Sequence, residues 1–290
     1  MTVKIVTYRA LEAGPTLTVL GAVHGNERCG AEAIGRLIED MDEGTVVLTR
    51  GTLQLMPVVN PKAFELNVRF VERNLNRYLY PKEEKRYYED QLDPIVCEVL
   101  DRTDVLLDLH SYTSPGGPFI FLDPQDPRET AYATALGVSD FVCGWSAAFG
   151  TQDSDREAQG TTEYARSRGA IAATLECGNH HNADATDIGY RAILRAMAHL
   201  GMRDSVGPAA EPRGGRRCVR MQSVYRRETG AELAKPWRHF DEVAKGEPMA
   251  RLTGGGIIAA PEDGYIVLPK ALADVGGEWF FFGTKTTLPA

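Results

Sequence analysis

The sequence contains no C-x-x-C pair, and none of its apolar runs approaches 18 residues. Its five cysteines are scattered and odd in number, which argues against a disulfide framework and favours a reducing compartment. The N-terminal residues lack the long apolar segment of a signal peptide, and no stretch is long enough for a transmembrane helix. We therefore expect a cytoplasmic protein with no membrane partner.

An excess of positive charge is also missing. The net charge is -8 at pH 7, which argues against nucleic acid as a partner. An acidic protein can still bind a small anion in a locally cationic pocket. Hydrophobic residues make up 43% of the chain and charged residues 25%, so its 290 residues can bury a full core.

Strand-like and helical segments alternate through the first two thirds of the chain. Apolar runs typical of buried strands occur at residues 17–23, 52–59, 105–110, 119–122, 141–145 and 170–176. Apolar residues recur at helical spacing near residues 28–43, 94–102, 128–137, 160–168 and 186–200. This alternation predicts a mostly parallel mixed sheet flanked by helices, with the functional site at the carboxyl ends of the strands.

The composition changes after residue 205. Residues 206–217 are rich in proline and glycine and are typical of a linker. Residues 218–290 contain short β-like runs separated by glycine and proline turns, which predicts a small β-barrel-like domain. We therefore expect an α/β catalytic domain over residues 1–205 and a β-rich C-terminal domain over residues 218–290.

Ionisable residues stand where three of the predicted strands end. His24 and Glu27 follow the first of these strands, His110 ends the second and Glu176 ends the third. A catalytic zinc takes three protein ligands and keeps one position for water, and His24, Glu27 and His110 form such a set. A carboxylate beside that water can take its proton, which is a role for Glu176. Asp108 lies on the same side of its strand as His110 and can orient that imidazole.

Each of these residues also has a purely structural explanation. His110 can be a hydrogen-bonded core histidine, Glu176 can cap a turn, and Asp108 can be structural. The long polar segment 62–90 carries several cations and amides, and a loop of this length in a compact domain is usually functional. It can equally be an ordinary solvated loop. The residues concerned are Arg69, Arg73, Asn74, Asn76 and Arg77.

Five motifs occur in the order and approximate spacing of the succinylglutamate desuccinylase/aspartoacylase family. They are His24-Gly-Asn-Glu27, Asn60-Pro61, Asn74-Leu-Asn76-Arg77, Asp108-Leu-His110 and Leu175-Glu176-Cys-Gly178. The sequence resembles this family, which belongs to the wider zinc carboxypeptidase group, over roughly residues 17–200. The β-rich tail also resembles the family's C-terminal domain. The resemblance implies a hydrolase with one Zn²⁺ per chain that cleaves an N-acyl amide.

The resemblance also implies roles for single residues. His24, Glu27 and His110 would hold zinc, and Glu176 would be the general base. Asn76 and Arg77 would bind a substrate carboxylate, for which the arginine fork is suited. Where aspartoacylase-like members carry an arginine that assists the scissile carbonyl, next to Asn-Pro, this chain has Lys62, and Asn74 takes the place of an aspartate. A further carboxylate-binding arginine corresponds to Arg168, with Arg166 as the alternative.

The C-terminal segment departs from aspartoacylase. The stretch that should supply a tyrosine reads Glu278-Trp279-Phe280-Phe281-Phe282. This predicts a larger or less polar ligand than N-acetylaspartate, unless Trp279 and the phenylalanines are simply core residues of the β-rich domain.

The sequence thus predicts a zinc-dependent amidohydrolase that acts on an N-acyl amino acid or a related small carboxylate, in a chain that can also form a homo-oligomer. A metallocarboxypeptidase and a zinc esterase remain as alternatives, because they share the same chemistry. A protein of this fold that binds without catalysing is a third alternative.

Overall fold

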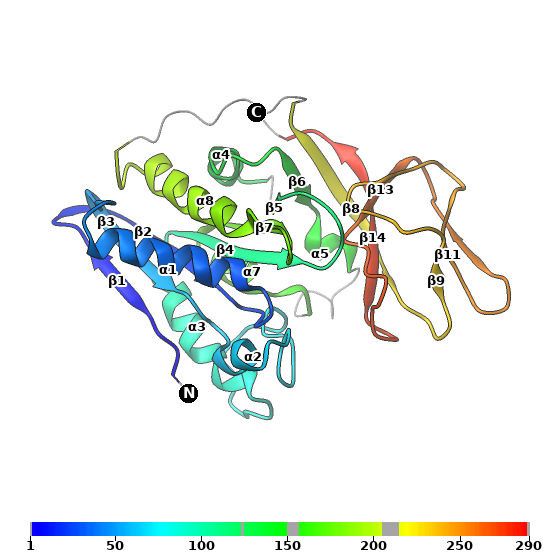
Figure 1. Ribbon diagram of the computed structural model, residues 1–290, viewed down its shortest axis with the longest axis horizontal. Coiled ribbons are helices and arrows are strands. Elements are labelled where there is room, and N and C mark those ends of the chain that lie inside the picture. Colours follow the sequence, from blue (N-terminus) through cyan, green and yellow to red (C-terminus); the bar gives the residue numbers. More distant parts are fainter. Residues whose placement is uncertain (1, 123–124, 150–156, 205–214, 289–290) are drawn as a thin grey trace.

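The computed structural model describes residues 2–122, 125–149, 157–204 and 215–288. Within them, eleven strands form one sheet in the order β1-β3-β2-β4-β7-β5-β6-β8-β14-β13-β10 (Figure 1). The strands of this sheet are β1 (Val6–Arg9), β2 (Glu12–Gly21), β3 (Arg50–Met56), β4 (Val105–Tyr112), β5 (Phe119–Phe121), β6 (Asp140–Cys143), β7 (Ile171–Asn179), β8 (Arg217–Arg226), β10 (Glu242–Val243), β13 (Gly264–Val267) and β14 (Glu278–Thr286).

The centre of the sheet is parallel. Strands β3, β2, β4 and β7 run in the same direction, whereas β1 pairs antiparallel with β3 and β5 pairs antiparallel with β7. Every residue of β4 is buried, as expected for a parallel strand covered on both faces. The predicted α/β fold with a mixed sheet flanked by helices is confirmed.

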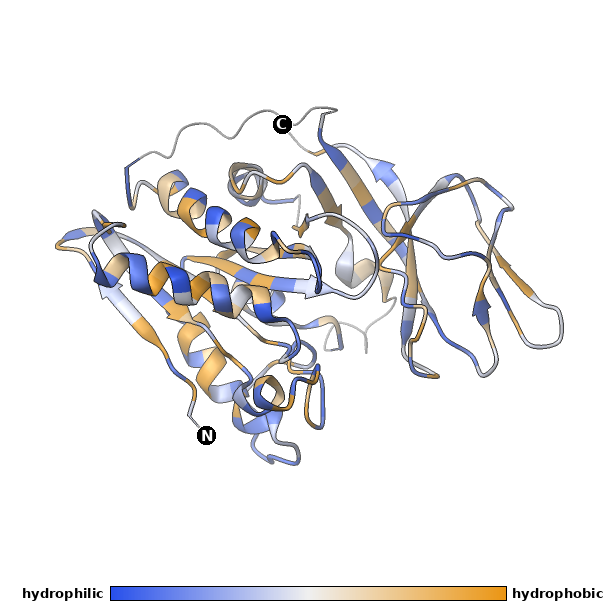
Figure 2. Ribbon diagram, in the orientation of Figure 1, coloured by the Kyte–Doolittle hydropathy of each residue, from blue (hydrophilic) through white to orange (hydrophobic). Residues whose placement is uncertain are grey.

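Helices cover both faces of the parallel strands. The helices are α1 (Arg28–Asp42), α2 (Pro61–Leu66), α3 (Asp93–Leu100), α4 (Pro127–Ala135), α5 (Trp145–Ala148), α7 (Thr161–Ser167) and α8 (Ala185–His199), with a 3₁₀ turn at Glu89–Gln91. Helices α1, α4 and α8 share one core with the sheet, and α3 and α7 share a second core on the opposite face. Hydrophilic and hydrophobic residues alternate along α1 and α8, as expected for helices with one buried face (Figure 2). None of the described helices is both long and apolar enough to cross a bilayer.

Helix α2 begins directly after the loop that follows β3, and a local sequence signal fixes where it starts. The side chain of Asn60 accepts a hydrogen bond from the backbone N–H of Ala63, and Pro61 occupies the first turn. An N-cap asparagine followed by proline is a strong helix start. The Asn60-Pro61 pair therefore begins a short helix instead of a loop.

The expected barrel-like C-terminal domain is not confirmed. Strand β8 pairs parallel with β6, and β14, β13 and β10 continue from β8, so these strands extend the sheet of the α/β part. Strands β9 (Glu232–Leu233), β11 (Pro248–Arg251) and β12 (Ile257–Ala259) form a separate small sheet. Most of the expected linker, residues 206–214, lies outside the described residues.

The aromatic run on β14 is core. Trp279, Phe280, Phe281 and Phe282 are each at most 1% exposed. Trp279, Phe280 and Phe282 pack in the core of the small sheet, whereas Phe281 packs on the other face with Phe119 and Val142. Packing in the core of the β-rich part therefore accounts for these four aromatic residues.

Candidate metal centre and active site

His24, Glu27 and His110 converge at the carboxyl ends of β2 and β4. Each offers one ligand atom, and these atoms all lie within 4.8 Å of one another. The Nδ1 atom of His24 is 2.9 Å from Oε1 of Glu27, and Nδ1 of His110 is 2.8 Å from Oε2. All three residues are at most 2% exposed. The structure therefore brings together the three residues that the sequence predicts as metal ligands.

A close backbone approach allows this convergence. At Gly25 an added Cβ would lie 2.0 Å from the carbonyl carbon of Ala63 in α2. No side chain fits there, so glycine lets the turn between His24 and Glu27 press against the helix.

The outer nitrogens of both imidazoles face oxygen atoms. Nε2 of His24 makes a hydrogen bond with Oδ1 of Asn74 at 2.9 Å, whereas Nε2 of His110 lies 2.9 Å from Oδ2 of Asp108 as a close ion pair without hydrogen-bond geometry. An amide or carboxylate oxygen favours a proton on the facing nitrogen, which leaves Nδ1 free to ligate. The buried Nδ1 of His24 makes no hydrogen bond within the described part of the chain. Two imidazole nitrogens that face one carboxylate fit a divalent metal, and the donor set N, N, O suits zinc.

The electrostatics of the three ligands favour a cation between them. Burial and the nearby Arg69 lower the pKa of His24 to about 4, so that imidazole is neutral. Burial alone would raise the pKa of Glu27, but His24 and His110 outweigh it and hold that pKa well below its usual range. Burial opposes a proton on His110, but Asp108 and Glu27 outweigh it and raise that pKa well above its usual range. A metal at this site would therefore replace a proton on His110.

Glu176 lies beside this group. It is the Cα partner of His110 in the pairing of β7 with β4, and it is 9% exposed. Its buried Oε2 has no hydrogen-bond partner within the described residues. Burial, and then the charge of Glu27, raise the pKa of Glu176 to about 8. A carboxyl group with such a pKa can take up and return a proton near neutral pH.

A cavity of about 880 Å³ opens over these residues. Polar side chains line part of it, namely those of His24, Arg69, Asn74, Asn76, Arg77, His110, Arg166, Glu176 and His180. Apolar side chains from the C-terminal part line another portion, namely those of Leu233, Trp237, Leu268, Leu272 and Phe281. A cavity of this size lies within the range of small-molecule sites.

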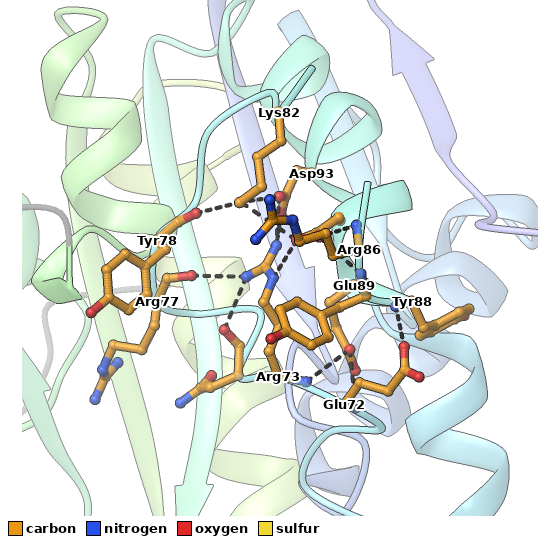
Figure 3. A network of polar contacts seen from close by, with 12 residues as sticks. Glu72, Arg73, Arg77, Tyr78, Lys82, Arg86, Tyr88, Glu89 and Asp93 are labelled. Atoms are coloured by element: carbon orange, nitrogen blue, oxygen red, sulfur yellow. Dashed lines mark hydrogen bonds and ion pairs between the residues drawn. The ribbon is translucent and has the colours of Figure 1, made fainter. Parts of the chain in front are cut away.

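The polar segment between α2 and α3 is held by buried carboxylates (Figure 3). Glu89 is fully buried and accepts backbone N–H groups from Val71, Glu72 and Arg73 at 2.7, 3.2 and 3.1 Å. It also accepts Nδ2 of Asn60 at 3.2 Å. Residues 69–78 of this segment therefore form a wall of the cavity, whereas residues 83–87 are exposed.

Arg73 belongs to this internal support. Its guanidinium pairs with Asp90 at 2.6 Å and with Asp93 at 2.5 Å, and Nζ of Lys82 lies 2.5 Å from Asp93. Figure 3 shows the side chain of Arg77 pointing away from this network, while its backbone carbonyl accepts a hydrogen bond from Arg73. The network thus fixes the backbone from which Arg77 projects.

Asn76 and Arg77 both reach the cavity, as the sequence predicts, but each already has a partner. Oδ1 of Asn76 accepts the backbone N–H of Thr161 at 2.8 Å, which ties the segment to the start of α7. The guanidinium of Arg77 lies 2.7 Å from Glu278 and 4.6 Å from the ring of Trp145. The sequence analysis names Glu278 only because it begins the stretch that differs from aspartoacylase. Its pairing with Arg77 was not predicted.

Lys62 does not lie in the cavity. It is exposed on α2, with Nζ 5.2 Å from the ring centre of Tyr88. Arg69 instead lines the cavity, with Nη1 2.7 Å from Oε1 of Glu27. The sequence indicates Arg69 only as one of several cations in the segment 62–90 and gives it no role of its own. The clustering of cations in that segment was the one sequence feature that pointed to it.

Arg168 also lies away from the cavity. Its half-exposed guanidinium pairs with Asp101 at 2.9 Å and contacts the hydroxyl of Tyr164. Arg166, the alternative, lines the cavity and pairs with Glu129 at 2.7 Å.

The chain was compared with known proteins. Residues 13–200 match the family model described as the succinylglutamate desuccinylase/aspartoacylase catalytic domain. A probable aspartoacylase of Nostoc sp. is 31% identical over 140 residues, which are 44% of this chain and 46% of that protein. An aspartoacylase of Xenopus tropicalis is 28% identical over 130 residues, which are 40% of each chain. The chain thus matches less than half the length of each of these two relatives.

Solved structures share the fold over nearly the whole chain. A succinylglutamate desuccinylase/aspartoacylase from Rhodobacter sphaeroides has a TM-score of 0.78 at 21% identity and covers 98% of this chain and 89% of its own. The product-bound ectoine utilization protein EutE from Ruegeria pomeroyi has a TM-score of 0.71 at 21% identity, with 97% and 88% covered. At these identities the likeness concerns the fold alone.

Proposed function

The chain belongs to the succinylglutamate desuccinylase/aspartoacylase family, and we propose that it is a zinc-dependent deacylase that hydrolyses the amide bond of an N-acyl amino acid. The observation that carries this proposal is the convergence of His24, Glu27 and His110, with Glu176 in register with His110 on the next strand and with His24, His110 and Glu176 lining one cavity. This arrangement supplies a metal site, a proton acceptor and room for a small substrate.

His24, Glu27 and His110 would hold the zinc. Two nitrogens and one carboxylate are the donors that zinc accepts in catalytic sites, whereas calcium and magnesium prefer oxygen alone. When bound, zinc supplies Lewis acidity that polarises the acyl carbonyl and makes a water more acidic. Asn74 and Asp108 would keep the two imidazoles in the ligating orientation, because each places an oxygen 2.9 Å from the outer nitrogen of one ring.

Glu176 would move the proton. It takes a proton from the water that attacks the acyl carbon, and it returns this proton to the leaving nitrogen when the C–N bond breaks. A pKa of about 8 lets it hold that proton between the two steps, and a divalent cation nearby would lower this pKa toward neutrality.

Arg69 would donate to the carbonyl oxygen as negative charge develops there. It takes the role that the sequence assigns to Lys62, because its guanidinium lies beside Glu27 whereas Lys62 faces solvent. A fixed donor at this position stabilises the transition state more than the ground state. Arg77 and Arg166, with Asn76 as a support, line the same cavity and would contribute positive charge that favours a substrate carboxylate.

Residues 218–290, which the sequence assigns to a C-terminal domain, would limit substrate size. Trp237, Leu268 and Phe281 from this part line the cavity. A wall on this side favours a small acylated amino acid over a polypeptide, and therefore a deacylase over a carboxypeptidase. The scattered cysteines are the basis on which we infer a cytoplasmic location.

The test combines metal analysis with a substrate screen. Purified protein is analysed for metal content and assayed against N-acyl amino acids, matched esters, and peptides with free or blocked C-termini. We expect one zinc per chain and hydrolysis of acyl amino acids. Cleavage of peptides alone would support the carboxypeptidase, and a protein that binds no zinc and cleaves nothing would overturn the proposal.

A further inference from the structure

Three charged side chains meet at the cavity, far apart in the sequence. Oε1 of Glu278 lies 2.7 Å from the guanidinium of Arg77, and Oε2 lies 3.3 Å from Nζ of Lys270. The three side chains are 16%, 10% and 31% exposed, and all of them line the cavity. We call this group the Glu278 cluster. Its members come from the segment before α3, from the turn before β14 and from the first residue of β14.

The Glu278 cluster carries one net positive charge. Burial alone would raise the pKa of Glu278, but Arg77 and Lys270 outweigh it and hold that pKa far below its usual range, so the carboxyl group is ionised. Two cations and one anion remain. In a largely buried site such a charge is screened less than on the surface, so it can hold one anion firmly.

The guanidinium of Arg77 is not free to bind a substrate carboxylate in a bidentate manner. One edge of its guanidinium meets Glu278, and its plane lies over the ring of Trp145. A substrate carboxylate that approached this edge would also approach the carboxylate of Glu278, and like charges at close range disfavour binding. The pairing therefore opposes a carboxylate placed directly on Arg77.

Other cations of the cavity wall are also paired. Among the described lining residues, Arg73 pairs with Asp90, Arg166 with Glu129, and Arg226 with Glu157. Arg69 pairs with a candidate metal ligand and lies beside the reacting centre. The net charge of the Glu278 cluster thus suits one substrate carboxylate. Among the described residues, every other lysine or arginine that lines the cavity is already paired with an acidic side chain, so a second substrate carboxylate would find no free cation.

Part of the wall near the cluster is apolar. Trp145 borders Arg77 and packs against Phe281, and Leu268 and Leu272 also line the cavity from the C-terminal part. The side chain of Leu272 is exposed. The cavity volume of about 880 Å³ lies toward the upper end of the range for small-molecule sites. There is room for an apolar group that would cover Leu272 when bound.

We propose that Glu278 determines the substrate class of this site, which takes N-acyl amino acids with a single carboxylate and an apolar side chain and rejects N-acyl dicarboxylates. The inference rests on the proposed function, because it assigns a specificity to that same reaction. Glu278 acts through Arg77 and Lys270 and by repulsion, so it is a positioning and selecting residue.

The test measures a ratio of substrates. N-acetyl-leucine and N-acetyl-aspartate are similar in size and differ in one carboxylate, and kcat/KM is measured for both with the wild type and with Glu278→Gln. We expect the wild type to prefer N-acetyl-leucine, and we expect the variant to shift the ratio toward N-acetyl-aspartate at least tenfold, mainly through KM. A variant that loses activity equally on both substrates has an unchanged ratio, and this result would overturn the inference.

A control and a second readout separate this inference from the proposed function. Glu98→Gln removes a carboxylate that does not line the cavity, and Glu98 and its partner Arg102 are 66% and 70% exposed, so we expect a ratio change below threefold. Calorimetry measures binding of both compounds to the wild type and to Glu278→Gln. If neither compound is hydrolysed but binding shifts as described, the proposed function fails and the selectivity stands. If hydrolysis occurs and neither ratio moves, the selectivity fails alone.

Discussion

The carboxylate of Glu89 offers the sharpest test of how the cavity wall is held. Glu89→Gln keeps the shape of the side chain and removes its charge. In the wild type, one oxygen accepts Val71 N–H and Asn60 Nδ2, and the other accepts the N–H groups of Glu72 and Arg73. Whichever way the new amide is oriented, its NH₂ group faces two donors, so two donors lose their acceptor.

The expected cost follows from these two losses. A hydrogen bond to a charged group contributes about 1.5–3 kcal/mol, so Glu89→Gln should lose about 3–6 kcal/mol of local stability. This is a large share of the roughly 5–15 kcal/mol that holds a native protein together. Because the same segment carries Asn74, which holds His24, zinc affinity should fall as well.

Two measurements check this prediction. Urea unfolding gives the change in the free energy of unfolding, and amide hydrogen exchange reports the protection of residues 71–73. Glu84→Gln is the matched control, because Glu84 and its partner Arg86 are 73% and 69% exposed, and the change should stay within about 0.5 kcal/mol. If the two variants unfold at the same urea concentration and residues 71–73 stay protected, Glu89 does not hold this segment.

Three further changes address the chemistry. Glu176→Gln should keep bound zinc by elemental analysis and lose about 10²–10⁴-fold in kcat, and retained turnover would contradict its role as the base. Arg69→Ala should lose about 10²–10³-fold in kcat, whereas Lys62→Ala, which removes a cation from the outer surface, should leave kcat unchanged; equal effects would refute the assignment of Arg69. The pKa of His110 is raised, and zinc must replace the proton on this imidazole, so the affinity for zinc should increase as the pH rises toward that pKa. Titration calorimetry in buffers of different ionisation enthalpy should detect the proton that is released when zinc binds. Binding that is independent of pH and buffer would show that His110 is neutral without metal.

The metal-binding group could be predicted from the sequence because its signals are local. His24, Glu27, His110 and Glu176 each stand at or directly after the end of an apolar strand, and parallel strands bring such ends to one edge. The side of the strand that Asp108 shares with His110 follows from the two-residue period.

The arginines could not be assigned because their directions depend on helix geometry. Arg166 and Arg168 are two residues apart near the end of α7, which turns them about 200° from each other around the helix axis. One therefore faces the cavity and the other faces Asp101. Lys62 lies in the first turn of α2, where the capped start of the helix leaves it exposed.

The partners of the site depend on contacts that no spacing reveals. Glu278 and Arg77 are 201 residues apart, and they meet because β14 joins the sheet through β8. Likewise, the short β-like runs of the C-terminal part gave no indication that β8 would pair with β6. Composition can predict strands, but it does not identify the edge to which they attach.

The pairing of β6 with β8 also determines whether the N-terminal part of the chain can remain soluble on its own. A polypeptide cut after residue 205 would leave the backbone groups of β6 on that side without partners, next to the buried Phe141 and Val142. An unprotected apolar edge of this kind recruits strands from other molecules and leads to aggregation. The N-terminal two thirds therefore need the C-terminal strands as a protective cover, and a shortened protein would be expected to accumulate in insoluble form.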